Sequence, residues 1–501
     1  MHKNEKKFAS ESIKSEHLTK KSPNKQLIFD KCSTKVYNAG KYSKRRAMTM
    51  LTKITVENFK SFDAMAELTM VSSSKIRSKK EHRVEIGSNT KLLKHAVIYG
   101  ANASGKSNLV DFIHFFQSTV RMGLPVWGTK YFCRNSQTNE KRDSTFEIQM
   151  EINGKFYAYG FTARLSERLI TGEWLYELFQ NGSSRCIFER EDNSKPILDS
   201  SVSLSKEEKN RFGTYAADFE DNISDLFLTE MNRGKKIAKD SNLQIFKTIY
   251  TWIVSHIVVV TPDSGKTDFK YYYGEGTLAL INSLISTFDT GVSNVRIEKI
   301  ELADLASMLP KPIFDDVVDR IKNSTSETED HIFRMSGRSD KSFFSIEWKE
   351  SEEPQITTIK LKHGNSIYDF DFADESDGTR RLFDLMDMLL MEDDDVVYIV
   401  DELERSLHPK LTEHFLELFA ERHKGNKNQL IFTTHESSIM DQKLLRRDEI
   451  WFIERDENNN SKIYSLDRFK ERYDKKLSKA YLEGRYGAIP VFKRFSFREE
   501  E

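Results

Sequence analysis

Short continuous apolar runs and amphipathic stretches alternate along most of the chain, which is typical of an α/β protein. Four apolar runs predict buried strands, and they read HAVIY (95–99), HIVVV (256–260), VVYIV (396–400) and QLIF (429–432). Alternation of apolar and polar positions predicts an opening strand at Leu51–Phe59 and a β-hairpin over Thr145–Ala163, which turns at Asn153-Gly154. The chain thus combines buried strands with half-exposed ones.

Amphipathic periodicity predicts helices between these strands. The predicted helices lie at 108–120, across most of 204–255, at 274–291, at 303–324 and at 372–390. Further strands are predicted at 169–178, 184–192, 342–349 and 357–364. The sequence shows no repeat of 20 to 50 residues and no sustained heptad, so we do not expect a long coiled coil.

Composition narrows the class of protein only a little. The 501 residues carry a net charge of −1, which favours neither nucleic acid nor an anionic membrane as a partner of the whole chain. The three cysteines are isolated and form no zinc or disulfide pattern, so a reducing cytoplasm is the expected compartment. No apolar run approaches the about 20 residues that span a bilayer, and we expect no membrane partner.

Residues 1–47 differ from the rest of the chain. They hold thirteen Lys and Arg against four acids, a net charge of +9, with few apolar residues. We expect a disordered basic tail. A nucleic-acid-binding arm and an over-extended reading frame both remain open, since Met48 and Met50 directly precede the first strand.

The segment YGANASGKSNL (99–109) matches the phosphate-binding loop pattern G-x-x-x-x-G-K-[ST]. A buried strand precedes it and a helix follows it, which is the setting that the pattern requires. Lys106 is expected to reach the β- and γ-phosphates, and the Ser107 hydroxyl to bind Mg²⁺. The residues predicted to bind the nucleotide here are Gly100, Asn102, Ala103, Ser104, Gly105, Lys106, Ser107 and Asn108.

Two later strands end in residues that suit the same site. The run VVYIV leads into Asp401-Glu402, and the next strand ends close to His435. Ligands of open α/β sheets bind at the carboxyl ends of the strands. We expect Asp401 to hold Mg²⁺, Glu402 to activate the attacking water, and His435 to contact the γ-phosphate or that water. The alternative is that the two acids only end a strand and that His435 is a structural residue.

The segment ESDGTRRL (375–382) opens a predicted helix with Ser376, Gly378 and Thr379. A Ser-x-Gly helix start is suited to an anion, although a plain capped helix after an Asp-Gly turn would look the same.

The order of these motifs resembles the ABC-type ATPase heads of SMC and RecF proteins. The segments GANASGKSNL, ESDGTRRL, VDELERSLHP, TTHESSIMD, RRDEIWFIE and YLEGRYGAIP are more closely similar to the RloA and AbiLi-like anti-phage ATPases, a type that includes the AriA subunit of PARIS. The resemblance implies an α/β P-loop ATPase head with a mixed sheet and a helical insert, which binds ATP and Mg²⁺ and forms dimers or higher oligomers. Ser376 and Gly378 would then contact nucleotide bound to the other subunit. Gln137 and Gln149 both remain candidates for the Q-loop glutamine, and Lys60 is a candidate nucleotide contact.

The resemblance also suggests a division of the chain. We expect the basic tail at 1–47, the N-terminal part of the ATPase with the Walker A loop at 48–190, a mainly helical insert at 191–340, and the signature, Walker B and histidine segments at 341–501. Only 66 residues follow His435, too few for a nuclease domain of about 100 residues. We therefore expect a separately encoded effector, such as a TOPRIM-like or RloB-like nuclease, and an anti-phage ATPase that senses or scaffolds. The alternative is a RecF-like DNA-repair ATPase that clamps DNA. Whether a phage protein triggers the system and whether the chain binds DNA are both open at this stage.

Overall fold

The computed structural model describes residues 48–490 except 88, 192–193, 221, 263–274, 324–331, 339–342, 350–352 and 471–475. The predicted basic tail at 1–47 lies outside the described residues.

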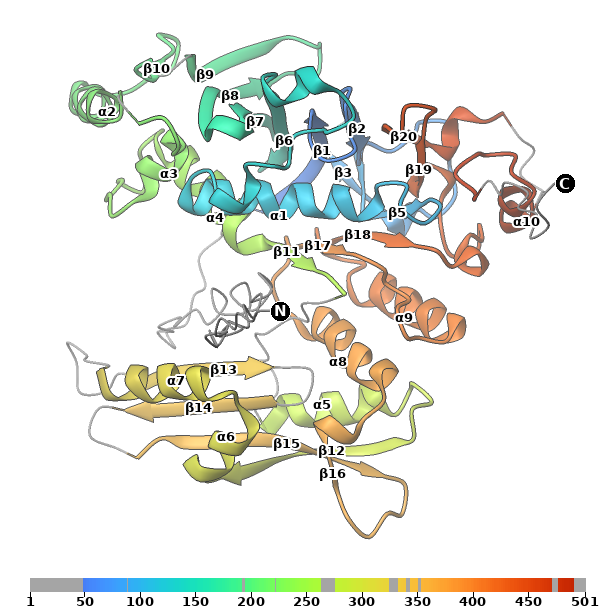
Figure 1. Ribbon diagram of the computed structural model, residues 1–501. Helices are drawn as coiled ribbons and strands as arrows, with labels where there is room; N and C mark the ends of the chain where they lie inside the picture. The colour runs from blue at the N-terminus through green and yellow to red at the C-terminus, as the bar shows by residue number, and fades with distance from the viewer. Residues whose placement is uncertain are drawn as a thin grey trace, which may run out of the picture.

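A six-stranded mixed sheet forms the centre of the molecule (Figure 1). Its first five strands are parallel, and only the last, β20, runs antiparallel to its neighbour. In spatial order the strands are β11 (Ile257–Val260), β17 (Val397–Val400), β18 (Gln429–Thr434), β5 (His95–Tyr99), β19 (Ile450–Arg455) and β20 (Ser461–Ser465). Every residue of β5, β17 and β18 is buried, which explains their continuous apolar runs. The predicted α/β class with a mixed sheet is confirmed.

Alternate residues of these strands face two separate cores. Ile98, Ile399 and Ile431 pack towards α1 (Lys106–Met122) on one face. Tyr99, Tyr398 and Phe432, which are their sequence neighbours, pack towards α8 (Asp377–Leu390) and α9 (Pro409–Arg422) on the other. The parallel sheet is therefore covered on both faces.

A second, fully antiparallel sheet lies on the far side of α1 (Figure 1). Its strands, in order, are β10 (Ile197–Leu198), β9 (Ser184–Glu191), β8 (Leu169–Leu178), β7 (Lys155–Arg164), β6 (Ser144–Ile152), β1 (Thr49–Glu57) and β2 (Ala66–Thr69). The predicted hairpin is β6 and β7, and both turn residues, Asn153 and Gly154, have positive φ. The phenylalanines of α1 stack on this sheet, with the Phe116 and Phe161 ring centroids 5.3 Å apart.

A buried glutamine fastens the two sheets together. The Gln429 side chain accepts a hydrogen bond from Leu51 N–H at 2.7 Å and donates to the carbonyls of Leu51 (3.0 Å) and Leu93 (2.9 Å). This satisfies the amide completely inside the core.

The predicted insert at 191–340 does not form one unit. Helices α2 (Lys206–Asp218), α3 (Phe227–Asn232) and α4 (Gln244–His256) pack with the first core through Phe212, Phe227 and Phe246. The same range contributes β10 to the second sheet and β11 to the central one, and its later helices and strands belong to a separate antiparallel sheet in the lower part of Figure 1. That sheet consists of β12 (Val292–Ile300), β15 (Gln355–His363), β14 (Phe343–Lys349) and β13 (Ile332–Arg338), with β16 (Phe370–Asp371) beside β15 and with α5 (Glu275–Ile285), α6 (Leu302–Met308) and α7 (Lys311–Asn323) around it.

This third sheet crosses the expected boundary at residue 340, because β13 pairs with β14. The helices of the range were expected, whereas β12 and β13 were not. A β-bulge near the start of β12 spaces its buried residues Val292 and Val295 three apart, so the two-residue alternation of a strand is missing.

The smaller elements complete the description. They are β3 (Arg83–Ile86), β4 (Thr90–Leu93), α10 (Leu477–Leu482) and the 3₁₀ helices η3 (Lys80–His82), η4 (Val126–Gly128), η5 (Gln137–Glu140), η6 (Leu165–Glu167), η8 (Phe372–Asp374), η9 (Ser437–Ile439), η10 (Arg447–Glu449) and η11 (Leu466–Arg468). None of the helices in the described part of the chain combines the length and the apolar character needed to cross a membrane.

Candidate functional site

The phosphate-binding loop joins β5 to α1 and depends on two glycines. A Cβ on Gly100 would lie 2.4 Å from the carbonyl oxygen of Ile453. Gly105 has φ +113°, and a Cβ there would lie 2.2 Å from the Ser461 Oγ. No other residue fits either position without displacing the loop. Asn102 and Ala103 are exposed on this loop, and Ser107 is exposed in the first turn of α1.

A pair of serines from distant segments holds the loop in place. The Ser461 Oγ lies 2.6 Å from both the Ser61 Oγ and the carbonyl oxygen of Ser104. The Asn108 side chain donates to the Ser61 Oγ at 2.7 Å. Sequence reasoning did not single out Ser61 or Ser461. Ser61 lies in the turn that follows β1, one residue after Lys60, and Ser461 follows an Asn-rich turn at the start of β20.

Lys106 is a buried cation without an anionic partner. Its side chain is 5% exposed, and its ammonium donates to the carbonyls of Gly100 (2.8 Å) and Ala101 (3.1 Å). No carboxylate among the described residues forms an ion pair with it. Burial lowers the pKa of Lys106 to about 8, although Asp401, Glu402 and Glu404 nearby act in the opposite direction. A buried ammonium surrounded by carbonyls and backbone N–H groups fits a phosphate, so this loop suits ATP.

The acidic pair follows β17 in a tight turn. Asp401 is buried, and its Oδ1 accepts a hydrogen bond of 2.5 Å from the Thr433 hydroxyl. The same hydroxyl accepts the N–H of Glu402 at 2.8 Å, and Glu402 has a left-handed backbone (φ 48°). Thr433 therefore binds the Asp401 carboxylate and also holds Glu402 in a backbone conformation that a residue other than glycine rarely adopts. From the sequence, Thr433 was not singled out; it opens the segment TTHESSIMD.

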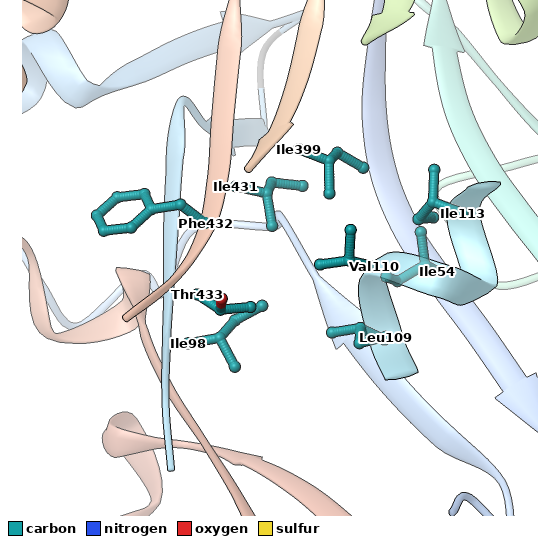
Figure 2. Close-up of a pocket in the computed structure, with 9 residues that line it drawn as sticks. All are labelled: Ile54, Ile98, Leu109, Val110, Ile113, Ile399, Ile431, Phe432 and Thr433. Atoms are coloured by element: carbon teal, nitrogen blue, oxygen red, sulfur yellow. The ribbon is translucent and has the colours of Figure 1, made fainter. Parts of the chain in front are cut away.

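Thr433 also borders an apolar cavity between α1 and the parallel sheet (Figure 2). The cavity is lined by Ile54, Ile98, Leu109, Val110, Ile113, Ile399, Ile431, Phe432 and Thr433. All but Thr433 are apolar, so this space is part of the packing behind the site rather than a place for a charged ligand.

His435 completes the arrangement. Its Nδ1 lies 3.4 Å from the Lys106 Nζ, and its Nε2 lies 3.9 Å from the Glu402 Oε1. The Glu404 carboxylate, which the sequence analysis did not consider, accepts the His435 backbone N–H at 2.6 Å. Burial, followed by the charge of Lys106, lowers the pKa of His435, so the imidazole is neutral at neutral pH. The structure thus brings Lys106, Asp401, Glu402 and His435 together at the carboxyl edge of the sheet.

The signature residues lie at the start of α8. Ser376 is its N-cap and accepts the N–H of Thr379 at 3.1 Å, and its side chain is exposed. Gly378 lies against the loop that follows the acidic pair, because a Cβ there would be 2.6 Å from the carbonyl oxygen of Ser406. Within the described residues, no hydrogen bond or ion pair links Ser376 or Gly378 to the phosphate-binding loop.

Arg381 connects this helix to the turn that holds Asp401 and Glu402. The Arg381 guanidinium donates to the carbonyls of Asp401 and Glu402, both at 3.1 Å. A movement of α8 would therefore displace the backbone of Asp401 and Glu402.

Lys60 and the two glutamine candidates are engaged elsewhere. Lys60 pairs with Asp111 and lies 4.3 Å from the centre of the Tyr131 ring. Gln149 is on β6 and donates to Glu147, and Gln137 begins η5. No nucleotide contact of Lys60 follows from this geometry, and the choice of Q-loop residue remains open.

Among solved structures, the chain is similar to the SMC head domain from Thermotoga maritima at 14% identity, with 83% of this chain and 98% of that chain covered and a TM-score of 0.33. It is also similar to an SMC head bound to the C-winged helix domain of ScpA, at 13% identity, with coverages of 84% and 99% and a TM-score of 0.32. Scores this low carry no conclusion about fold or function. A comparison with curated proteins gave no match.

The comparison with protein families is more informative. Residues 96–441, from β5 through the phosphate-binding loop to the segment after His435, match one family profile. Because this match spans more than half of the chain, the protein belongs to the family described as "AAA domain, putative AbiEii toxin, Type IV TA system".

Proposed function

We propose that this protein binds and hydrolyses ATP with Mg²⁺. The observation that carries the proposal is the convergence of Lys106, Asp401, Glu402 and His435 at one sheet edge, although they lie up to 329 positions apart in the chain. A buried ammonium without a counterion, a buried carboxylate and a half-buried carboxylate are the three charges that phosphoryl transfer to water requires.

Each of these side chains has a distinct task in the proposed reaction. Lys106 and the loop N–H groups would bind the phosphates, and Ser107 with Asp401 would hold Mg²⁺, which when bound offsets the negative charge of the phosphates. Glu402 would accept a proton from the attacking water, and the neutral His435 imidazole would orient that water by a hydrogen bond. Thr433 and Glu404 would keep these groups in place.

The test is phosphate release from ATP by the full chain and by two variants. Lys106→Ala should lose ATP binding, and Glu402→Gln should bind ATP but hydrolyse it at least about 100-fold more slowly. Glu421→Gln, on the exposed face of α9, is the matched control and should keep wild-type activity. Equal activity in wild type and Glu402→Gln would contradict the proposal.

We further propose that two copies of the chain share their nucleotide sites. The exposed Ser376 and the half-buried Gly378 of one copy would contact the phosphates bound to Lys106 of the other, with the Ser406 loop at the seam. This rests on the exposure of the α8 start and on its close approach to the loop after Glu402. ATP would then hold the assembly together, and hydrolysis would release it. In light scattering, Glu402→Gln should form dimers or larger oligomers only with ATP.

As biological role we propose a cytoplasmic anti-phage ATPase that senses infection and controls a separate effector, such as a TOPRIM-like or RloB-like nuclease. The family description, with its putative AbiEii toxin, supports a role in a toxic system. The locus should protect cells against phage, and Lys106→Ala or Glu402→Gln should abolish protection. Protection that persists with both variants would overturn this role.

The second candidate is a DNA clamp of the RecF kind, favoured by the net charge of +9 at 1–47. It predicts ATP-dependent DNA binding that weakens steeply with salt. If that binding survives in a chain starting at Met50, the clamp is favoured over the effector-controlling role.

A further inference from the structure

A buried cluster of potential metal ligands lies at the opposite end of β5 from the phosphate-binding loop. His82 ends η3, His95 begins β5, and Glu449 ends η10. Their exposed fractions are 5%, 3% and 0%. Two histidines that are 13 residues apart and a glutamate more than 350 residues later therefore lie together inside the protein.

The three potential ligand atoms lie close together. The His82 Nδ1 is 2.9 Å from the Glu449 Oε1 and 3.1 Å from its Oε2. The His95 Nδ1 is 3.5 Å from the same Oε1. All three ligand atoms lie within 4.8 Å of one another, and the two imidazole rings are 4.6 Å apart.

Hydrogen bonding accounts for only part of this arrangement. The Nδ1 of His95 is buried, and the Glu449 Oε1 that it faces is 3.5 Å away, too far for a normal hydrogen bond. A buried polar atom without a partner is costly, and a bound ion is one of the few explanations for it. The atom is directed at the Glu449 carboxylate and the His82 ring, which are themselves metal-ligand groups.

The neighbouring cations do not neutralise the Glu449 carboxylate. The Arg446 guanidinium pairs with Asp448 at 2.7 Å, and only the backbone N–H of Arg446 reaches Glu449. The Lys94 ammonium, next to His95, donates to the carbonyls of His423 (2.6 Å) and Lys424 (2.9 Å). The Glu449 carboxylate therefore keeps a negative charge, which a cation bound between it and the two imidazoles would balance.

We propose that His82, His95 and Glu449 form a binding site for a divalent transition metal, with Zn²⁺ as the best match. Two histidine nitrogens and one carboxylate oxygen, completed by a water, are a common zinc donor set. Zinc–ligand distances of about 2.0 to 2.2 Å place tetrahedral ligands about 3.3 to 3.6 Å apart. The distance of 3.5 Å lies in that range, and the distance of 2.9 Å would need to lengthen by about 0.4 Å to reach it.

The role of this site is structural and separate from ATP hydrolysis. His95 and Tyr99 stand at opposite ends of β5, about 13 Å apart along the strand. The metal would tie η3 and η10 to the strand that carries the phosphate-binding loop. It would thus stabilise the scaffold without entering the reaction.

The test measures zinc in the full-length protein by mass spectrometry after equilibration with Zn²⁺ and desalting. Wild type and Glu402→Gln should retain about one zinc per chain, and Glu449→Gln should retain at least about tenfold less. Co²⁺ bound to wild type should show the visible absorption bands of tetrahedral coordination. This measurement uses wild-type protein alone, so it does not depend on whether a variant folds. Glu402→Gln separates this site from the nucleotide site, so loss of the proposed ATPase activity would leave the zinc result unchanged.

Two results would overturn the proposal. One is wild-type protein that retains no stoichiometric zinc and gives no tetrahedral Co²⁺ spectrum. The other is a folded Glu449→Gln protein that retains as much zinc as wild type.

Discussion

Replacement of Thr433 by valine removes one hydroxyl and keeps the shape of the side chain. That hydroxyl donates to the Asp401 carboxylate at 2.5 Å and accepts the Glu402 N–H at 2.8 Å. Thr433 is fully buried and Asp401 is 4% exposed, so water cannot replace either bond. The substitution therefore leaves a buried carboxylate oxygen and a backbone N–H without this partner.

The expected cost follows from these two bonds. A hydrogen bond to a charged group contributes about 1.5 to 3 kcal/mol, and an unpaired buried N–H costs about 1 to 3 kcal/mol. Part of this is recovered by relaxation of the turn, so we expect the free energy of unfolding to fall by about 3 kcal/mol. Displacement of Glu402 by even 1 Å should lower the kcat for ATP hydrolysis by about 100-fold.

The assay combines urea denaturation with steady-state ATP hydrolysis and direct ATP titration. Thr433→Val should bind ATP with nearly wild-type affinity while its kcat falls, because Lys106 and the loop are untouched. Thr433→Ser keeps the hydroxyl and should recover most of the activity, losing only the methyl group that faces the apolar cavity (Figure 2). Wild-type stability and kcat in Thr433→Val would refute the reasoning.

Three further predictions concern the phosphate-binding loop. Gly105→Ala should weaken ATP binding at least about tenfold in a fluorescent-nucleotide titration, because the new Cβ would meet the Ser461 hydroxyl and the backbone has φ +113°. The control is Gly213→Ala on α2, where a Cβ meets open space, and it should leave binding unchanged. Ser461→Ala should raise the KM for ATP several-fold with little change in kcat, since it removes a hydrogen bond to the phosphate-binding loop but none to the two acids. An unchanged KM would show that the Ser61–Ser461 pair does not position the loop. Because burial lowers the pKa of Lys106 to about 8, its charged form is lost as the pH rises, and the KM for ATP should increase about tenfold between pH 7 and pH 9; a flat profile would contradict this.

The sequence predicted the elements of the site because each has a local signal. The glycine and lysine spacing at 100–106, the apolar run before Asp401 and the strand before His435 can each be seen within about ten residues. Parallel strands bring their carboxyl ends to one edge of a sheet, so the meeting of these residues followed from the fold class. The structure places them together as that argument requires.

The supporting residues could not be found in this way. Ser61 and Ser461 meet across 400 positions of the chain, and hydroxyl side chains are too common to mark a contact by themselves. Thr433 belongs to an apolar strand, where a threonine is ordinary, and its role depends on the neighbouring strand ending at the same level.

The third sheet escaped prediction for a different reason. The bulge in β12 breaks its alternation, and β14 was predicted as a strand without its partner β13. Pairing between short strands depends on contacts across the sheet, which a single sequence does not display.

A mixing experiment distinguishes a shared nucleotide site, completed by two copies of the chain, from a site made by one copy alone. Lys106→Ala removes the phosphate-binding lysine, and Ser376→Arg blocks the signature surface, so each variant alone should be inactive. In an equal mixture, half of the dimers would contain one copy of each variant and therefore one intact composite site. The account predicts that mixing restores up to about a quarter of the wild-type ATPase activity. A mixture that is no more active than the two variants measured separately would contradict it.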